Sequence, residues 1–338
     1  MRNKILVTIG PASFNKQTIT EMDAIGVYLF RINLSHTKLS DVTDVINSLR
    51  SWSDTPISLD TEGAQIRNEA MRNNEVEFCK GTLVNIHPGS IIGDSANISF
   101  TPKSVFCQLR VDDVINVDFN TVSLKVIEVH SDKIVSIVES GGIVGSNKAT
   151  DINNSNIELD PITEKDRKAI KIGLDLGIKH FSLSFTNKAS DVLLMREIIG
   201  AESQLISKIE SIKGVLNLDE ILPLVDQILI DRGDLSREVS IEKIPFIQRR
   251  IISKARSKDT PVFVATNLLE SMIKKSTPTR AEVNDIASTL LMGANGLVLA
   301  AETAIGAHPV GAVKMTNALM TQFDRWTPDS SCREIIFN

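Results

Sequence analysis

The sequence predicts an α/β protein built as a (β/α)₈ barrel, a TIM barrel, with a small β-domain inserted after the third strand. Strand-like apolar runs alternate with helical periodicity eight times over about 250 residues. Between about residues 68 and 156 the alternation stops, and short β-type runs with turn residues take its place. A doubly wound open sheet is the alternative, although no glycine fingerprint follows the first strand.

Composition limits the class of protein. The chain has 338 residues, a hydrophobic fraction of 42% and a net charge of −5, without any basic block that would indicate nucleic-acid binding. No apolar run is long enough to span a membrane, and the start resembles no signal peptide. The three cysteines, Cys79, Cys107 and Cys332, are far apart and form no metal or disulfide pattern, which predicts a reducing cytoplasm.

The elements before the insertion read strand, helix, strand, helix, strand. We expect strands at 5–9, 27–32 and 57–60 and helices at 17–25 and 39–49. This order implies parallel strands with helical crossovers. The insertion then contains strand-like runs at 83–86, 114–117, 123–129 and 134–138. The predicted domains are 1–67 and 158–338 for the barrel and 68–157 for a small inserted β-barrel.

The alternation resumes after the insertion. Thr163 with Asp166, and Thr279 with Glu282, have the spacing of capping boxes at helix N-termini. The expected strands cover 181–185, 204–210, 227–230, 261–266 and 296–300. The expected helices cover 163–176, 190–199, the segment around 215–222, 246–255, 279–291 and 310–323.

Polar side chains gather where these strands end, which is the end that carries active sites in such barrels. They are Arg31, Asn33, Asp60, Ser184, Lys208, Glu210, Arg232, Asp234, Thr266 and Glu302. A purely structural barrel does not need such a ring of polar groups. We therefore predict a catalytic site at this end of the barrel.

Lys208, Glu210 and Asp234 form the centre of this prediction. Side chains alternate along a strand, so Lys208 and Glu210 point to the same side. If the next strand is a neighbour, Asp234 joins Glu210, and two carboxylates from separate elements suit Mg²⁺. The alternative interpretation is a surface ion pair with an aspartate that caps a helix.

Motifs along nearly the whole chain resemble the pyruvate kinase family. They are Thr8-Ile9-Gly10-Pro11-Ala12-Ser13, Arg31-Ile32-Asn33-Leu34-Ser35-His36, Leu59-Asp60-Thr61, Ile206-Ser207-Lys208-Ile209-Glu210, Arg232-Gly233-Asp234-Leu235, Ala265-Thr266, Leu269-Glu270-Ser271-Met272, Pro278-Thr279-Arg280-Ala281-Glu282 and Glu302-Thr303-Ala304. The resemblance implies a barrel with an inserted β-domain that acts as a lid. It also implies phosphoryl transfer between phosphoenolpyruvate and ADP, giving pyruvate and ATP, in a cytoplasmic homo-oligomer.

The resemblance also implies roles for particular residues. Glu210 and Asp234 would hold Mg²⁺ or Mn²⁺, Lys208 would stabilise the transferring phosphoryl group, and Thr266 would lie on the proton route to the enolate carbon. The remaining substrate positions are Arg31 for the phosphate, Ser184, and the amides of Gly233 and Asp234 for the carboxylate. The positions for K⁺ are Asn33, Ser35, Asp60 and Thr61, and those for the nucleotide are Arg67, His36 and Lys148.

Most departures from the family pattern fall at positions that the resemblance places near the nucleotide or behind the residues that contact metal and substrate. The residues implied to bind the metal and the enolpyruvate are kept. Phe14 replaces an arginine, Glu62 replaces a lysine, and Asp231 stands where a small residue is usual. The others are Thr37, Ala64-Gln65, Asp118-Phe119-Asn120, Asn267, Ala300-Ala301 and Ile305. The chain ends at Asn338, so we expect a short form without the family's C-terminal effector domain.

Two alternatives stay open at this point. One is a relative that keeps metal-assisted enolpyruvate or oxo-acid chemistry but uses another phosphoryl partner. The other is a non-catalytic regulatory homologue, against which the presence of Lys208, Glu210, Asp234 and Thr266 argues, since a protein without catalysis need not keep four spaced chemical groups.

Overall fold

The computed structural model of the protein describes residues 4–118, 120–153 and 157–337. The chain forms two compact units, one of Met1–Gly63 with Ile162–Asn338 and one of Ala64–Pro161. Each unit has its own hydrophobic core. We describe the two units separately.

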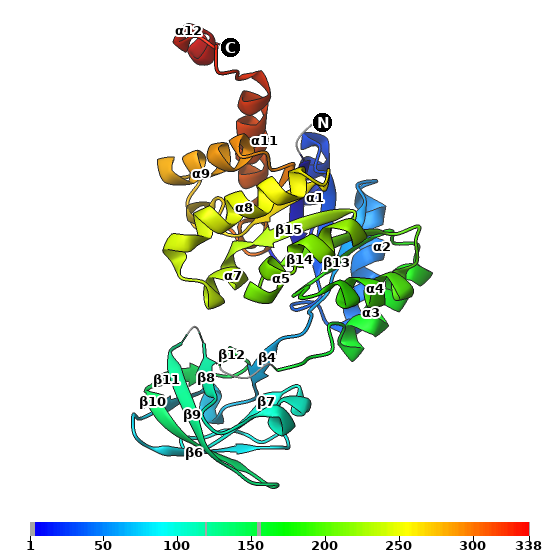
Figure 1. Ribbon diagram of the computed structural model, residues 1–338. Coiled ribbons are helices and arrows are strands. Elements are labelled where there is room, and N and C mark those ends of the chain that lie inside the picture. The colour runs from blue at the N-terminus through cyan, green and yellow to red at the C-terminus, as the bar shows by residue number, and fades with distance from the viewer. Residues whose placement is uncertain (1–3, 119, 154–156, 338) are drawn as a thin grey trace. The chain divides into compact units, whose positions relative to one another are not determined.

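The first unit is a closed barrel of parallel strands in the order β1-β17-β16-β15-β14-β13-β3-β2 (Figure 1). The strands are β1 Lys4–Ile9, β2 Leu29–Asn33, β3 Ile57–Asp60, β13 His180–Leu183, β14 Gln204–Ile209, β15 Gln227–Asp231, β16 Val262–Ala265 and β17 Gly296–Leu299. Because β1 pairs with β17, the sheet closes on itself. The predicted (β/α)₈ barrel is confirmed, and the open doubly wound sheet is wrong.

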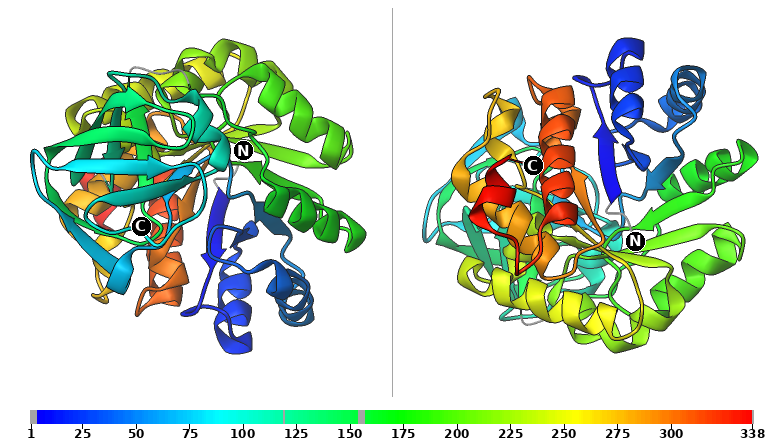
Figure 2. Two further views of the ribbon diagram at one scale, coloured as in Figure 1. Left: turned by 90° about the horizontal axis from the view of Figure 1, so that it is seen from below. Right: turned by 90° about the horizontal axis from the view of Figure 1, so that it is seen from above.

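Helices follow the strands and surround the barrel in chain order (Figure 2), except the last, 332–337, which lies beyond the end of the helix before it (Figure 1). They are α1 Lys16–Ile25, α2 Val42–Trp52, α3 Glu164–Asp175, α4 Ala189–Ile199, α5 Ile212–Leu216, α6 Leu218–Ile221, α7 Arg232–Glu238, α8 Ile244–Arg256, α9 Arg280–Leu291, α10 Ala301–Ala304, α11 Pro309–Arg325 and α12 Cys332–Phe337. The short helices α7, α10 and α12 are not among the helices expected above. Helices as short as these show too little periodicity to be recognised in a sequence.

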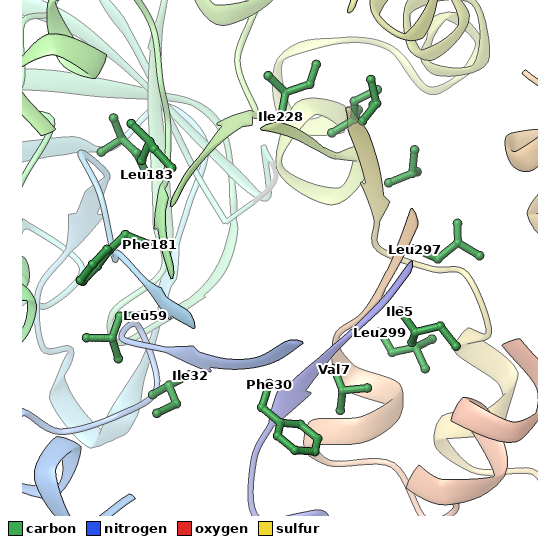
Figure 3. Close-up of a cluster of buried hydrophobic side chains, with 14 of the residues drawn as sticks. Ile5, Val7, Phe30, Ile32, Leu59, Phe181, Leu183, Ile228, Leu297 and Leu299 are labelled. Atoms are coloured by element: carbon green, nitrogen blue, oxygen red, sulfur yellow. The ribbon is translucent and has the colours of Figure 1, made fainter. Parts of the chain in front are cut away.

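The strands are buried on both faces. Ile5 and Val7 of β1 point outward and pack with the helices, as do the other labelled side chains in Figure 3. Leu6, between them, belongs to a separate cluster in the barrel interior, with Phe263 and Val298. This alternation explains why the strands read as continuous apolar runs in the sequence.

Both predicted capping boxes are present. Thr163 and Asp166 cap α3, and Thr279 and Glu282 cap α9. Asp166 is fully buried and also accepts hydrogen bonds from the amides of Glu62 at 2.7 Å and Gly63 at 3.1 Å. The same carboxylate therefore begins α3 and fixes the loop after β3.

The second unit contains a closed barrel in the order β10-β6-β7-β4-β12-β8-β9, with a separate two-stranded sheet. The barrel strands are β4 Ile66–Asn68, β6 Leu83–His87, β7 Asn97–Thr101, β8 Val114–Val117, β9 Val122–Val129, β10 Ile134–Ser140 and β12 Ala149–Asn153, and the separate pair is β5 Glu75–Phe78 and β11 Gly142–Gly145. This confirms the predicted inserted β-barrel. Its alternating side chains, such as Val122, Leu124 and Val126, fill the interior.

The three cysteines are free and exposed. Among the described helices, none has the length and apolar character needed to cross a lipid bilayer.

Candidate active site

Lys208 and Glu210 project together from the end of β14 into a buried polar cluster. Lys208 Nζ lies 2.8 Å from Glu210 Oε1, 3.0 Å from Ser184 Oγ and 3.4 Å from Asp60 Oδ2. The Lys208 side chain is 6% exposed and that of Glu210 is 0% exposed. The cluster brings β3, β13 and β14 together, and the alternative of a surface ion pair is wrong because both charged groups are buried.

Glu210 has one oxygen fixed and one under-used. Its Oε2 accepts a hydrogen bond of 2.6 Å from the amide of Phe185, which follows β13. Phe185 has φ +50, so the chain leaves the strand there and turns its amide to the carboxylate. Oε1 faces the Lys208 ammonium as an ion pair, yet it is buried and accepts no hydrogen bond of good geometry from the described residues.

Asp231 and Asp234 bring two further carboxylates to Glu210. One oxygen from each of the three residues lies within 4.8 Å of the others. Asp231 is the last residue of β15 and caps α7, while Asp234 lies in the first turn of α7. Arg237, one turn later, is 3.3 Å from Asp234 Oδ1.

This crowding of charge shifts the pKa values of the cluster. Burial raises the pKa of Glu210 to about 8, and the charges of Asp234 and Asp231 add to the rise against the opposing effect of Lys208. Burial also raises the pKa of Asp234, again reinforced by Asp231. Burial alone would lower the pKa of Lys208, but Asp60 and Glu210 outweigh it and raise that pKa. Negative charge therefore exceeds what the ammonium balances, so the cluster favours a bound cation.

Thr266 follows β16 and donates a hydrogen bond of 2.5 Å from its Oγ1 to Asp231 Oδ1. Its backbone has φ +75, which is rare for a β-branched residue and costs of order 1–3 kcal/mol. Arg232 holds this conformation, because its guanidinium donates to the carbonyl oxygen of Thr266 and pairs with Asp285 at 2.7 Å. Neighbouring elements thus fix the position of the Thr266 hydroxyl.

Gly233 is required at its position. A Cβ there would meet Thr266 Cγ2 at 2.7 Å, so only glycine allows α7 to start so close to β16. Its amide donates to Asp231 Oδ1 at 3.2 Å. The amide that the resemblance assigns to a substrate carboxylate is therefore already bonded to a carboxylate of the chain itself.

Arg31 and Asp60 form a buried ion pair beside Lys208. Arg31 donates to Asp60 Oδ2 from Nε at 2.8 Å and from Nη2, and its Nη1 donates to Thr8 Oγ1 at 2.8 Å. Asp60 Oδ1 is buried and has no hydrogen-bond partner within the described chain. Arg31 keeps one N–H on each terminal nitrogen for a further acceptor.

The other residues predicted for K⁺ lie near Asp60 but are already hydrogen-bonded. Asn33 Oδ1 accepts from the amide of Ser35 at 3.0 Å. Thr61 Oγ1 accepts from the amide of Ser184 at 2.9 Å, and its carbonyl oxygen accepts from Ser184 Oγ at 2.7 Å. The side-chain oxygens of Asn33 and Thr61 are thus already in use, whereas Asp60 Oδ1 accepts no hydrogen bond from the described residues.

The positions predicted for the nucleotide belong to both units. His36 is exposed on the first unit. In the second unit, Arg67 donates to Asn147 O at 2.9 Å and Gln65 Oε1 at 2.7 Å, and Lys148 pairs with Asp118 at 3.3 Å. Phe119, the middle of the predicted 118–120 turn, lies outside the described residues.

Among the departures on the first unit, Phe14 and Glu62 each have a side-chain partner. The ring of Phe14 packs against Trp52 with a centroid distance of 5.2 Å. Glu62 Oε2 lies 3.4 Å from Lys165 Nζ, which also donates to Leu34 O at 2.5 Å. Lys165 therefore partly compensates the negative charge that Glu62 introduces.

Sequence reasoning missed Asp231 as a member of the cluster. It noted the residue as a departure but assigned it no role, although its place at the last position of a barrel strand was a signal. Glu302 is also buried, but it accepts from the amides of Leu269 at 3.1 Å and Ala300 at 2.9 Å. It holds the loops after β16 and β17 in position and does not join the cluster.

Comparison of the sequence with known proteins finds similar proteins of one family. Residues 1–313 match the family described as pyruvate kinase, barrel domain. The chain is 35% identical over 334 residues to a pyruvate kinase of Thermotoga maritima, covering 95% of this chain and 71% of that protein. It is 35% identical over 326 residues to a pyruvate kinase of Geobacillus stearothermophilus, covering 93% of this chain and 55% of that protein.

A solved structure agrees as well. The crystal structure of a pyruvate kinase from Cryptosporidium parvum superposes with a TM-score of 0.87 at 30% identity, covering 97% of this chain and 70% of that one. The barrel, the inserted β-unit and the strand-end cluster all occur in a chain that is similar to these proteins over nearly its whole length. This chain belongs to the pyruvate kinase family.

Proposed function

We propose that the protein transfers a phosphoryl group between phosphoenolpyruvate and ADP, giving pyruvate and ATP, in a reaction that requires Mg²⁺. Family membership supports this, and the observation that carries it is the cluster of buried Lys208 and Glu210 with half-buried Asp234. Phosphoryl transfer depends mainly on positioning and on neutralising charge, and this cluster has the groups for both.

Glu210 and Asp234 are the proposed ligands of Mg²⁺ or Mn²⁺. Carboxylate oxygens are the ligands that these hard cations prefer, and Glu210 Oε1 is buried without a hydrogen bond. A bound divalent cation supplies charge neutralisation for the phosphoryl and enolate oxygens. The raised pKa values of Glu210 and Asp234 are consistent with carboxylates whose negative charge is incompletely balanced until such a cation binds.

The other proposed roles belong to side chains around this cluster. Lys208 would stabilise charge on the transferring phosphoryl group and the enolate oxygen. Arg31 would bind the phosphate with its two remaining N–H donors. Ser184 would contact the substrate, and Thr266 would carry a proton toward the enolate carbon, with its hydroxyl position fixed by Asp231 and by Arg232 on its backbone.

K⁺ is a further proposed ion, with Asp60 as its anchor. Asp60 Oδ1 is buried and unpaired among the described residues, which suits a cation. Asn33, Ser35 and Thr61 would complete the site, with Asn33 and Thr61 also accepting the hydrogen bonds described above.

For the nucleotide we propose His36, Arg67 and Lys148, as the family resemblance implies. The free cysteines and the glycolytic type of reaction favour a cytoplasmic location.

A coupled assay tests the proposal. Phosphoenolpyruvate, ADP, Mg²⁺ and K⁺ are supplied with lactate dehydrogenase, and NADH oxidation is followed. We expect turnover that requires phosphoenolpyruvate, ADP and Mg²⁺ and that Lys208→Met lowers about a hundredfold to a thousandfold. Absence of turnover in folded wild-type protein that binds Mg²⁺ and phosphoenolpyruvate would refute ADP as the acceptor.

A second candidate is a related reaction with another phosphoryl acceptor. Phe14 and Glu62 favour it, because an aromatic pair and an ion pair occupy positions where the family pattern has cations. The same assay with a panel of nucleoside diphosphates, and with ADP omitted, distinguishes the two candidates. Pyruvate release with another diphosphate but not with ADP would favour this second function.

A further inference from the structure

Asp231 carries an inference beyond the proposed function, and this inference rests on the proposed metal site. The residue could act only as a helix cap, because Oδ1 accepts from the amide of Gly233 at 3.2 Å and from the Thr266 hydroxyl at 2.5 Å. Both of these bonds use the same oxygen. Within the described part of the chain, no hydrogen bond to Asp231 Oδ2 occurs. The helix cap therefore uses only one of the two carboxylate oxygens.

The position of Asp231 relative to the other carboxylates indicates a further use for this carboxylate. Asp231, Glu210 and Asp234 each bring one oxygen within 4.8 Å of the others. Oxygens on one octahedral cation are about 3 Å apart when adjacent and about 4.2 Å apart when opposite, for Mg–O distances of about 2.1 Å. Small side-chain movements therefore suffice for all three to contact one ion.

A second, independent observation supports a cation here. Glu210 is 1% exposed, and its Oε1 accepts no hydrogen bond of good geometry from any residue the structure describes. Three carboxylates face the positive charge of Lys208, Arg31 adds positive charge near Glu210 and Asp231, and Arg237 lies beside Asp234. A helix cap does not need this concentration of negative charge, whereas a divalent cation neutralises it.

We propose that Asp231 is a third carboxylate of the divalent-cation site in this chain, added to Glu210 and Asp234. Its oxygen strengthens binding of the bare cation, since affinity for hard cations rises with the charge of the ligand set. The same negative charge reduces the net positive charge of the loaded site. It therefore weakens the binding of a dicarboxylate such as oxalate on the metal. Asp231 also accepts the hydrogen bond of the Gly233 amide, which is then not available to the dicarboxylate.

Two substitutions separate the charge of Asp231 from its hydrogen bonds. Asp231→Asn keeps an oxygen that accepts from Thr266 and Gly233 but removes the charge. Asp231→Ala removes both. Glu210→Gln is the positive control for the metal site, and Asp219→Asn is the control for net charge, because Asp219 lies on α6 and pairs with Lys254 at 2.6 Å.

Free Mn²⁺ is titrated by electron paramagnetic resonance against each protein without substrates, and oxalate is then titrated into the Mn²⁺-loaded proteins by calorimetry. We expect Asp231→Asn and Asp231→Ala to weaken Mn²⁺ binding about tenfold or more, with Asp219→Asn unchanged. At saturating Mn²⁺, both Asp231 variants should bind oxalate more tightly than wild type.

Wild-type Mn²⁺ affinity in Asp231→Asn, alongside weak binding in Glu210→Gln, would overturn the role of Asp231 and leave the proposed metal site intact. Unchanged affinity in Glu210→Gln as well would refute the metal site itself. Thermal melting of each metal-free variant checks folding. We expect Asp231→Asn to be at least as stable as wild type, because it relieves repulsion within the cluster.

Discussion

The ends of β14, β15 and β16 differ sharply from the ends of β1 and β3 in the same barrel. At the first, buried Lys208 and Glu210 join half-buried Asp231 in a strongly charged network, and Glu210 Oε1 accepts no hydrogen bond of good geometry from the described residues. At the second, Phe14 packs on Trp52, and Glu62 pairs with Lys165. In the first region the charges are incompletely balanced, which suits the cation proposed above, whereas the second is satisfied by its own side chains.

The difference indicates which of the two regions is the better candidate for the site of the reaction. Buried charge that is incompletely paired costs free energy, so its presence points to a ligand. Paired or apolar side chains carry no such cost and need no ligand. We therefore expect substitutions in the first region to change the reaction itself and substitutions in the second to change only affinity.

The largest effect should follow the removal of Lys208. Lys208→Met deletes the buried cation that faces Glu210 and Ser184, and loss of one such contact costs about 3–4 kcal/mol, or roughly a hundredfold to a thousandfold in kcat. Lys165→Met, in the second region, is the matched control and should keep most of the activity. Equal losses in the two variants would remove the contrast between the regions.

The next largest effect concerns the metal ligands. Glu210→Ala and Asp234→Ala should abolish Mg²⁺-dependent oxalate binding, measured by calorimetry, because each removes a carboxylate from the same site. Circular dichroism confirms that the variants are folded. Undiminished oxalate binding in both variants would move the metal elsewhere.

A smaller effect is expected from pH. Because burial raises the pKa of Glu210 to about 8 from 4.5, the folded protein holds a proton there that the unfolded chain has released. The metal-free protein should therefore lose stability as pH rises from about 4.5 to about 8. Mg²⁺ replaces that proton, so the rise in Tm caused by Mg²⁺ should be larger at pH 8 than at pH 6.

Glu210→Gln serves as the control for this pH dependence. It cannot ionise, so the slope of Tm against pH should flatten in the metal-free variant. A Mg²⁺-induced rise in Tm that is the same at pH 6 and pH 8 in wild type would contradict the role given to Glu210.

The smallest effect is expected at Phe14. Phe14→Arg introduces a cation at an exposed position and should strengthen ADP binding up to about fivefold, the range of an exposed charge pair. The gain should shrink as salt is added, because salt screens exposed charges. Phe14→Gln removes the ring without adding charge, and an equal gain in that variant would show that charge is not the cause.

The sequence predicted the barrel because its strands are buried on both faces and its helices carry clear periodicity. The position of Lys208 beside Glu210 followed from strand alternation alone. The third carboxylate did not follow, because the distance from Asp231 to Glu210 depends on the register between the neighbouring strands β14 and β15. The contacts of Phe14 with Trp52 and of Glu62 with Lys165 could not be predicted either, because each joins elements whose relative positions depend on the tertiary structure.

The hydrogen bonds of Asp166 bear on whether the barrel depends on the inserted unit. Glu62 and Gly63 are the last residues before the inserted unit, and Thr163 comes just after it. Asp166 bonds to all three, so the barrel's own contacts hold together the point where the chain leaves and the point where it returns. The insertion is therefore a module: a short turn that replaces residues 64–161 should leave a barrel that still closes.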